Sequence, residues 1–140
     1  MSRVILLAAD RPLPLLEPAF RRVRCTGKFT VESDGFSVRP HEYYRSAVDE
    51  LGLALKPFQY ELDLEATQED ADALRFYLME HCRPGERVEL WNLWVGVDRE
   101  DRVPHFQGEL AGLALDTLEQ LCSPPMERGC PGQCWLTVTI

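Results

Sequence analysis

Three of the five cysteines lie close together near the C-terminus, and thiolates are the side chains that bind zinc or form disulfides. Cys122, Cys130 and Cys134 are separated by seven and by three intervening residues. A structural zinc site usually has two close pairs of ligands, and this chain offers one such pair. We therefore expect free thiols, no bound metal and no cofactor. A disulfide or a metal site that includes Cys130 and Cys134 is the alternative.

The histidines have no spacing that links them to a nucleophile. His41, His81 and His105 stand far apart, and no catalytic signature surrounds them. A cysteine nucleophile needs a base beside it. His81 adjoins Cys82, but we expect it to interact with the last carbonyl groups of a helix instead. The glycine-rich loops that cradle phosphate groups are also missing from the sequence. The sequence favours a protein without catalytic activity, and an enzyme that uses cysteine and histidine is the last alternative.

Acidic side chains alternate with apolar ones along residues 58–65. This is the pattern of a strand with one buried and one solvated face. Glu61, Asp63 and Glu65 share the solvated face, where neighbouring side chains stand about 7 Å apart. Such a row of carboxylates suits a protein partner with a basic surface, a hard cation or an acid/base pair. The alternative is an ordinary solvated sheet face.

Two tryptophans are predicted to lie on the same face as these acids. Trp135 alternates with apolar residues that point to the core, and Trp91 has the same sidedness if strand 87–96 is regular. That strand is apolar on both sides in its second half, which fits a central strand covered on both faces or a bulge near Trp91. Tryptophan surrounded by charge resembles the centre of a protein interface. The two tryptophans and the three acids are the predicted binding site, unless residues 1–52 cover the tryptophans.

The overall charge restricts the class of partner. The formal net charge is −8 and the sequence pI is about 4.9, which argues against nucleic acid and against an anionic membrane surface. Residues 4–9 are too few for a signal-peptide core or a membrane span. Arg21, Arg22 and Arg24 form the densest basic cluster and are expected to lie on a solvated loop. The odd number of cysteines indicates a reduced, cytoplasmic protein.

Hydrophobic periodicity and turn residues predict the order of the elements. Residues 4–9 are continuously apolar, which is typical of a strand buried on both faces. Asp34-Gly35 predicts a hairpin turn between strands at 28–31 and 36–38. The other expected elements are a helix over 44–51, a strand over 58–65, a helix over 67–82 capped by Thr67, strands over 87–96 and 105–115 joined by a charged turn at 97–104, a helix starting at Asp116, and a strand over 135–140.

From residue 58 to residue 140 the expected order is βαββαβ. This order resembles the ferredoxin-like superfold, in which two helices cover one face of four antiparallel strands. Because many unrelated functions use that fold, the resemblance implies no activity. Residues 1–57 are expected to extend or cover the same sheet. The predicted fold is one α+β domain over residues 1–140, with an antiparallel sheet and helices mainly on one face.

Three function classes remain, in order of preference. The first is a non-catalytic binding module, of which an inhibitor or immunity-type protein is one version, that holds a protein partner on the acidic, tryptophan-bearing sheet face. The second is a sensor or carrier with a small-molecule pocket between the sheet and Tyr43, Tyr44 or Tyr60. The third is the enzyme that uses cysteine and histidine.

Overall fold

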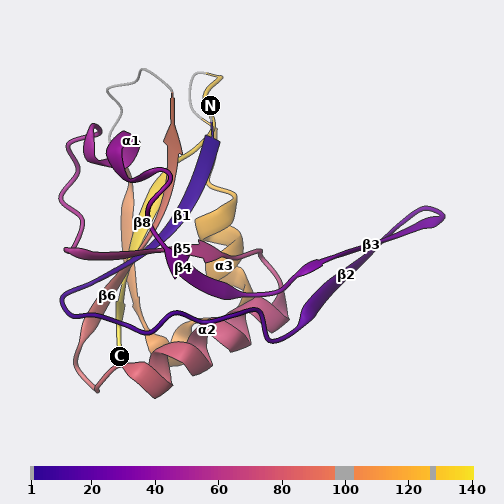
Figure 1. The fold of residues 1–140 in the computed structure, drawn as a ribbon, viewed down its shortest axis with the longest axis horizontal. Helices are drawn as coiled ribbons and strands as arrows, with labels where there is room; N and C mark the ends of the chain where they lie inside the picture. Colours follow the sequence, from indigo (N-terminus) through magenta and orange to yellow (C-terminus); the bar gives the residue numbers. More distant parts are fainter. Residues whose placement is uncertain (1, 97–102, 127–128) are drawn as a thin grey trace.

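The computed structural model describes residues 2–96, 103–126 and 129–140, which form a mixed six-stranded sheet, a separate two-stranded sheet and three α-helices (Figure 1). The expected turn at 97–104 lies mostly outside these residues. The strands are β1 (Ser2–Ala9), β2 (Arg21–Thr26), β3 (Phe29–Asp34), β4 (Ser37–Pro40), β5 (Phe58–Asp63), β6 (Arg87–Val95), β7 (His105–Glu109) and β8 (Cys134–Thr139). The helices are α1 (Arg45–Asp49), α2 (Gln68–His81) and α3 (Leu115–Cys122), with a 3₁₀ turn at Leu110–Gly112.

The fold is α+β, as expected, but the strand order does not confirm the ferredoxin-like topology. The large sheet runs β4-β5-β1-β6-β8-β7, and all neighbours are antiparallel except β7 and β8. In the expected arrangement β7 would return antiparallel beside β6, whereas here it lies beyond β8 and runs parallel to it. The expected order also leaves out β1, whose residues 4–9 are buried on both faces. Such a strand is satisfied only in the middle of a sheet, and it lies between β5 and β6.

Two of the three helices of the described chain, α2 and α3, pack on one face of the large sheet, as expected. Leu74 and Leu78 of α2 and Leu118 and Leu121 of α3 are fully buried in the larger core. Thr67 caps α2, as predicted, because its hydroxyl accepts a hydrogen bond from the backbone N–H of Asp70 at 3.1 Å. Helix α3 begins at Leu115, one residue before the predicted start, and its N-cap is Ala114 rather than Asp116.

A smaller core covers the opposite face of the sheet. It contains Val4, Leu6, Trp91 and Leu93, over which residues 44–55 pack, including the short helix α1. Strand β6 therefore has apolar neighbours on both faces. Its pairing runs without interruption against β1 and against β8, so the bulge considered near Trp91 is excluded and the central-strand interpretation is right.

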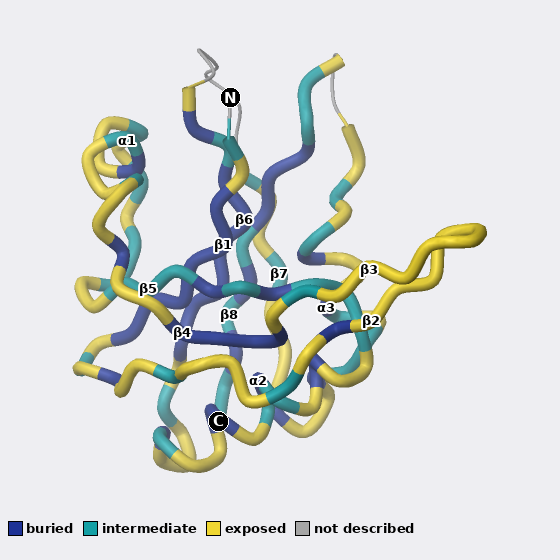
Figure 2. The backbone as a smooth tube through the Cα atoms, turned by 45° about the vertical axis from the view of Figure 1, so that its right-hand side comes forward, coloured by how far each residue is buried: buried dark blue, intermediate teal, exposed yellow. Residues whose placement is uncertain are grey.

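The hairpin predicted from Asp34-Gly35 is in the wrong place. The hairpin of the structure is formed by β2 and β3 and turns at Gly27, which has a φ of 60°. Gly35 instead marks the break between β3 and β4, where its N–H donates to the carbonyl oxygen of Phe20 at 2.8 Å. We call the pair β2–β3 the arm. It projects away from the body of the molecule, and most of its length is exposed (Figures 1 and 2).

Candidate interaction surfaces

The predicted acidic and aromatic residues lie on one face of the large sheet. Cross-strand pairing connects Glu61 to Leu6, Leu6 to Trp91, and Trp91 to Trp135. Residues that face each other across a strand pair share a side of the sheet. This is the face of the smaller core, opposite to α2 and α3.

The expectation that both tryptophans are exposed on this face is wrong for Trp91. Its side chain is 3% exposed, because residues 44–55 pack over it. The ring of Trp91 stacks on that of Trp135, with centroids 4.4 Å apart and planes 5° apart. Trp135 is half-buried, and its ring also stacks on that of His105 with centroids 3.8 Å apart. The covering segment removes a large aromatic area from water, which is the physical reason for its position.

Two of the three predicted acids are already paired with arginines of the arm. Asp63 accepts a hydrogen bond from Nη1 of Arg22 at 2.9 Å, and Glu65 forms an ion pair with Arg24. Among the described residues, Glu61 has no such partner. Burial raises the pKa of its carboxyl group, while nearby Arg39 opposes that rise. The negative charge of this row is therefore partly neutralised from within the protein. Binding of a partner by these residues stays a prediction.

The side chain of Arg22 is the centre of a buried ion cluster that the sequence did not indicate. Nε and Nη2 donate to the two carboxylate oxygens of Asp70 at 3.0 and 2.5 Å. The other three N–H groups reach Asp63 Oδ1 and the carbonyl oxygens of Asp34 and Asp63. All five guanidinium donors are thus used. The side chain of Arg22 is 5% exposed and that of Asp70 is fully buried, so the solvated loop expected at residues 21–24 is wrong for Arg22.

The ionic state of this cluster follows from its hydrogen bonds. Burial would raise the pKa of Asp70, but hydrogen bonds from Arg22, from the Thr67 hydroxyl and from the backbone N–H of Glu65 hold it below its ordinary value. Burial would lower the pKa of Arg22, but hydrogen bonds to its carboxylate partners outweigh this effect and hold the pKa above its ordinary value. Both groups are charged, and together they join the base of the arm to the end of β5 and the first turn of α2.

Beyond this base the arm presents apolar side chains to solvent. Val23 is 59% exposed, Val31 is 54% exposed and Phe29 is 77% exposed. Phe29 and Val31 share one face of the ribbon, because they alternate along β3, and Val23 lies on the other face. Within the described chain, β2 and β3 pair only with each other. Most of their residues are exposed, so both faces of the ribbon stay uncovered along much of its length (Figure 2).

A shallow depression of about 310 Å³ lies where β1 and β5 separate. Pairing between these strands ends at Leu6 and Glu61, and the chain beyond leaves an opening lined by Arg3, Arg39 and Tyr44. Of the other two tyrosines considered for a pocket, Tyr43 is exposed, and the hydroxyl of Tyr60 accepts a hydrogen bond from the N–H of Leu13. The depression therefore combines acidic and basic side chains with one tyrosine.

The cysteines and histidines do not form a recognisable reactive site. All five cysteines are unpaired, and burial raises the pKa of Cys134 to about 11 and the pKa of Cys122 above its ordinary value. A thiol with a raised pKa is a poor nucleophile. His41 is 5% exposed, and neither ring nitrogen has a hydrogen-bond partner. Across residues 2–96, 103–126 and 129–140, no three side chains of histidine, cysteine, aspartate or glutamate converge as metal ligands.

Comparisons with known proteins found no matching family model, no similar curated protein and no similar solved structure. Among the described helices, none has the length and apolar character needed to cross a membrane.

Proposed function

We propose that this protein is a non-catalytic protein-interaction module that contacts its partner through the arm. The observation that supports this proposal most strongly is the exposure of Phe29, an aromatic side chain that is 77% exposed on a projecting ribbon. Val23 and Val31 add apolar area on the two faces of the same ribbon. Exposed apolar groups gathered on one element are typical of binding surfaces, and aromatic side chains dominate the energy of many interfaces.

The buried cluster at the base of the arm gives this surface a defined position. A two-stranded hairpin by itself is only marginally stable in water. Arg22 and Asp70 join the arm to α2, and Gly35 packs against Phe20 where the arm meets the body. A binding element that is held in place before it meets its partner loses less conformational entropy on binding.

The sheet face predicted from the sequence is a weaker candidate for the contact surface. Trp91 is covered, and Asp63 and Glu65 are paired with arginines. The proposal keeps the class of function, including an inhibitor or immunity-type protein as one version, and moves the contact to the arm. The same proposal includes a protein rather than a nucleic-acid partner, which the net charge of −8 supports. It also includes a cytoplasmic location, for which the odd number of cysteines is the support.

A comparison of co-purified proteins tests this proposal. Tagged wild-type protein and the double variant Phe29→Ser, Val31→Ser would be recovered from extracts of the source cells, and bound proteins would be quantified by mass spectrometry. The matched control is Phe76→Ser, because Phe76 is also well exposed, at 67%, but lies on α2. We expect the amount of partner recovered with the arm variant to fall at least about tenfold, as when an interface anchor is truncated. The control should retain it.

Two results would contradict the proposal. One is recovery of the same partners, in the same amounts, by the arm variant and by wild-type protein. The other is the absence of any protein enriched over an unrelated tagged protein of similar charge. Circular dichroism of both variants checks that the fold is intact.

A small-molecule carrier is the second candidate, and the depression between β1 and β5 favours it. Glu61 and Arg39 are cross-strand partners on its wall but do not form an ion pair with each other, and Tyr44 also lines the depression. A carboxylate and a guanidinium that are not paired with each other suit a ligand that carries both charges, such as an amino acid. Ligand-observed NMR with a mixture of amino acids would detect such binding, and Glu61→Gln should abolish it. No signal from any amino acid would reject this candidate.

A further inference from the structure

The two edges of the large sheet differ in how they end. At β4 the edge is closed, because the backbone of Leu16 exchanges two hydrogen bonds of 3.0 Å with that of Val38. Pro40, in the same strand, has no N–H to offer. At the other edge, β7 pairs with β8 alone among the described strands. An edge strand with free backbone groups is a template for another strand.

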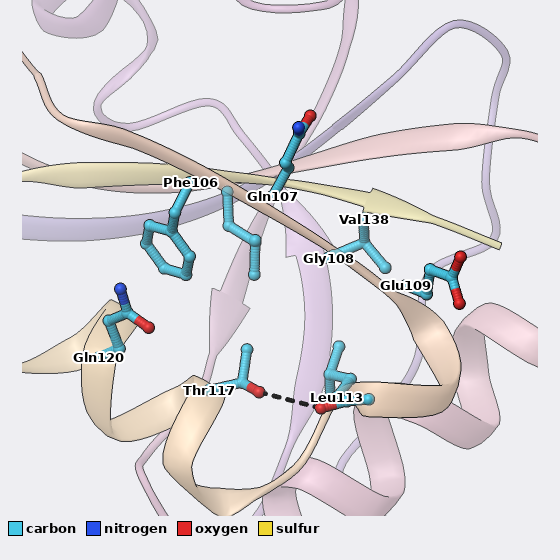
Figure 3. A pocket seen from close by; sticks show the side chains of 10 residues that line it. Phe106, Gln107, Gly108, Glu109, Leu113, Thr117, Gln120 and Val138 are labelled. Atoms are coloured by element: carbon cyan, nitrogen blue, oxygen red, sulfur yellow. Dashed lines mark hydrogen bonds between the residues drawn. The ribbon is translucent and has the colours of Figure 1, made fainter.

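A groove lies beside β7, on the side of the sheet that faces α3. Its volume is about 190 Å³, and its apolar walls come from Phe106, Leu113, Leu136 and Val138. Figure 3 shows the groove between the strands and α3, with Phe106 and Gln120 toward one end and Glu109 toward the other. The groove therefore offers apolar contact directly alongside an open strand edge.

The space in this groove exists because β7 contains Gly108. Its cross-strand partner is Val138, which faces the larger core, so a side chain at position 108 would point toward the helices. A Cβ atom built on Gly108 meets no other atom within 4 Å. An ordinary strand residue at this position would fill the groove from within the chain.

The elements around the groove carry negative charge, and Glu109 is the charged residue among those that line it. Residues 103–126 contain Glu109, Asp116 and Glu119, and no lysine or arginine. These residues form β7, the 3₁₀ turn and α3, which are the elements around the groove. Complementary charge favours a basic segment over an acidic one.

We propose that β7 and its groove bind an extended peptide segment of another protein, which adds to the sheet as a further strand. In this mode of recognition, backbone hydrogen bonds supply affinity and pockets for alternate side chains supply specificity. The segment carries an apolar side chain that enters the space left by Gly108, and lysine or arginine residues flank it. This site is separate from the arm, and it goes beyond the function proposed above.

A peptide display experiment on the full-length protein tests this inference. The probe is a random library of peptides of about nine residues, which is long enough to form a strand. We expect enrichment of sequences with an apolar centre, flanking lysine or arginine and no proline. A synthetic peptide of the enriched sequence would then be titrated by fluorescence anisotropy. Amide hydrogen exchange should show new protection at His105–Glu109 in the complex.

Variants separate this site from the arm. Gly108→Val fills the groove with a residue that favours strands, and it should weaken the peptide by at least about tenfold while the protein stays folded. Gln120→Lys places a positive charge at the exposed rim and should also weaken a basic peptide. The arm variant Phe29→Ser should bind the peptide as wild-type protein does. The peptide-binding inference can therefore hold when the arm proposal fails, and the arm proposal can hold when the inference fails.

Three results would overturn the inference. The first is enrichment of no peptide of the stated kind. The second is a peptide affinity that Gly108→Val and Gln120→Lys both leave within about twofold of wild type. The third is a dimer of the wild-type protein that Gly108→Val abolishes, because a second copy of the chain would then be the occupant of the groove.

Discussion

The base and the tip of the arm are made from the same two strands, yet the base buries charged side chains and the tip exposes apolar ones. At the base, the charged side chain of Arg22 is 5% exposed and its partner Asp70 is fully buried. Toward the tip, Phe29 is 77% exposed and Val31 is 54% exposed. The usual assignment of charge to the surface and apolar groups to the interior is reversed along one ribbon.

The reversal indicates two separate roles. A buried ion pair contributes little net stability relative to a well-packed apolar pair, but loss of one partner leaves an uncompensated charge. The cluster around Arg22 therefore specifies where the arm attaches. The apolar side chains toward the tip contribute little to the fold, so they stay available to a partner.

The largest effect is expected from Asp70→Ala, which removes the main partner of Arg22. A buried guanidinium that loses this fully buried carboxylate and keeps Asp63 should lower the free energy of unfolding by about 3–5 kcal/mol. Urea denaturation measures this change. The control is Asp72→Ala, an exposed acid of the same helix, which should change stability by less than about 0.5 kcal/mol. Similar values for both variants would mean that the cluster does not anchor the arm.

Lowering the pH should weaken the attachment of the arm to the body, because this attachment depends on the ionised carboxylate of Asp70. The pKa of Asp70 in the folded protein lies below the ordinary value of 3.8, which the unfolded chain retains. The unfolded state therefore binds the proton first, and the contribution of Asp70 to stability is complete above about pH 3.8. That contribution is lost as the pH falls through the lower folded pKa.

The measurement is the difference in free energy of unfolding between wild-type protein and Asp70→Asn, followed by urea denaturation as the pH is lowered. The asparagine cannot ionise, so other carboxylates cancel in the difference. The difference should shrink in the acid range just described. A constant difference down to the lowest pH at which the protein folds would contradict the prediction.

Substitution of the glycines at the two ends of the arm should have intermediate effects, on global stability at the base and on local amide exchange near the tip. In Gly35→Ala, at the base, the new Cβ would lie 2.6 Å from the ring and 2.7 Å from the carbonyl oxygen of Phe20. Relief of this clash should cost about 1–3 kcal/mol of global stability, measured by thermal denaturation. In Gly27→Ala, near the tip, the new Cβ meets nothing within 4 Å, and only the φ of 60° is unfavourable. That strain should speed amide exchange in the arm and leave the global transition unchanged.

The exposed pair between Arg24 and Glu65 should matter least. The side chain of Arg24 is 62% exposed, and exposed ion pairs contribute at most about 1 kcal/mol. Arg24→Ala should therefore change the urea midpoint only slightly. A loss as large as that in Asp70→Ala would show that the anchor extends beyond the buried cluster and that the boundary between base and tip lies further along the arm.

Several local features of the fold followed from the sequence because their cause lies within a few residues. The continuous apolar run of β1, the alternation of residues 58–63 in β5 and the cap at Thr67 are set by neighbouring side chains and backbone groups. The sidedness of Glu61 and Trp135 followed in the same way, because alternation along a strand fixes it. Asp34-Gly35 misled because Gly35 is required by the close approach of Phe20, a contact between separate segments.

The candidate site depended on contacts that no local pattern contains. Arg22 and Asp70 are 48 residues apart in the chain, and the position of Asp70 in the capping turn gave the only hint of a buried carboxylate. Whether Trp91 lies in an interface or in a core depended on the path of residues 44–55. The open edge at β7 depended on the position of this strand beyond β8, at the end of the sheet.

The sequence by itself determined the α+β class, most of the strands and helices, and which side chains share a face, because periodicity of two or of 3.6 residues acts locally. Only the tertiary structure decided the strand order, the anchoring of the arm and the cover over Trp91. These features arise when segments distant in the chain compete to bury the same apolar area or to satisfy the same charge. That competition is settled by the free energy of the whole fold, which no single segment carries.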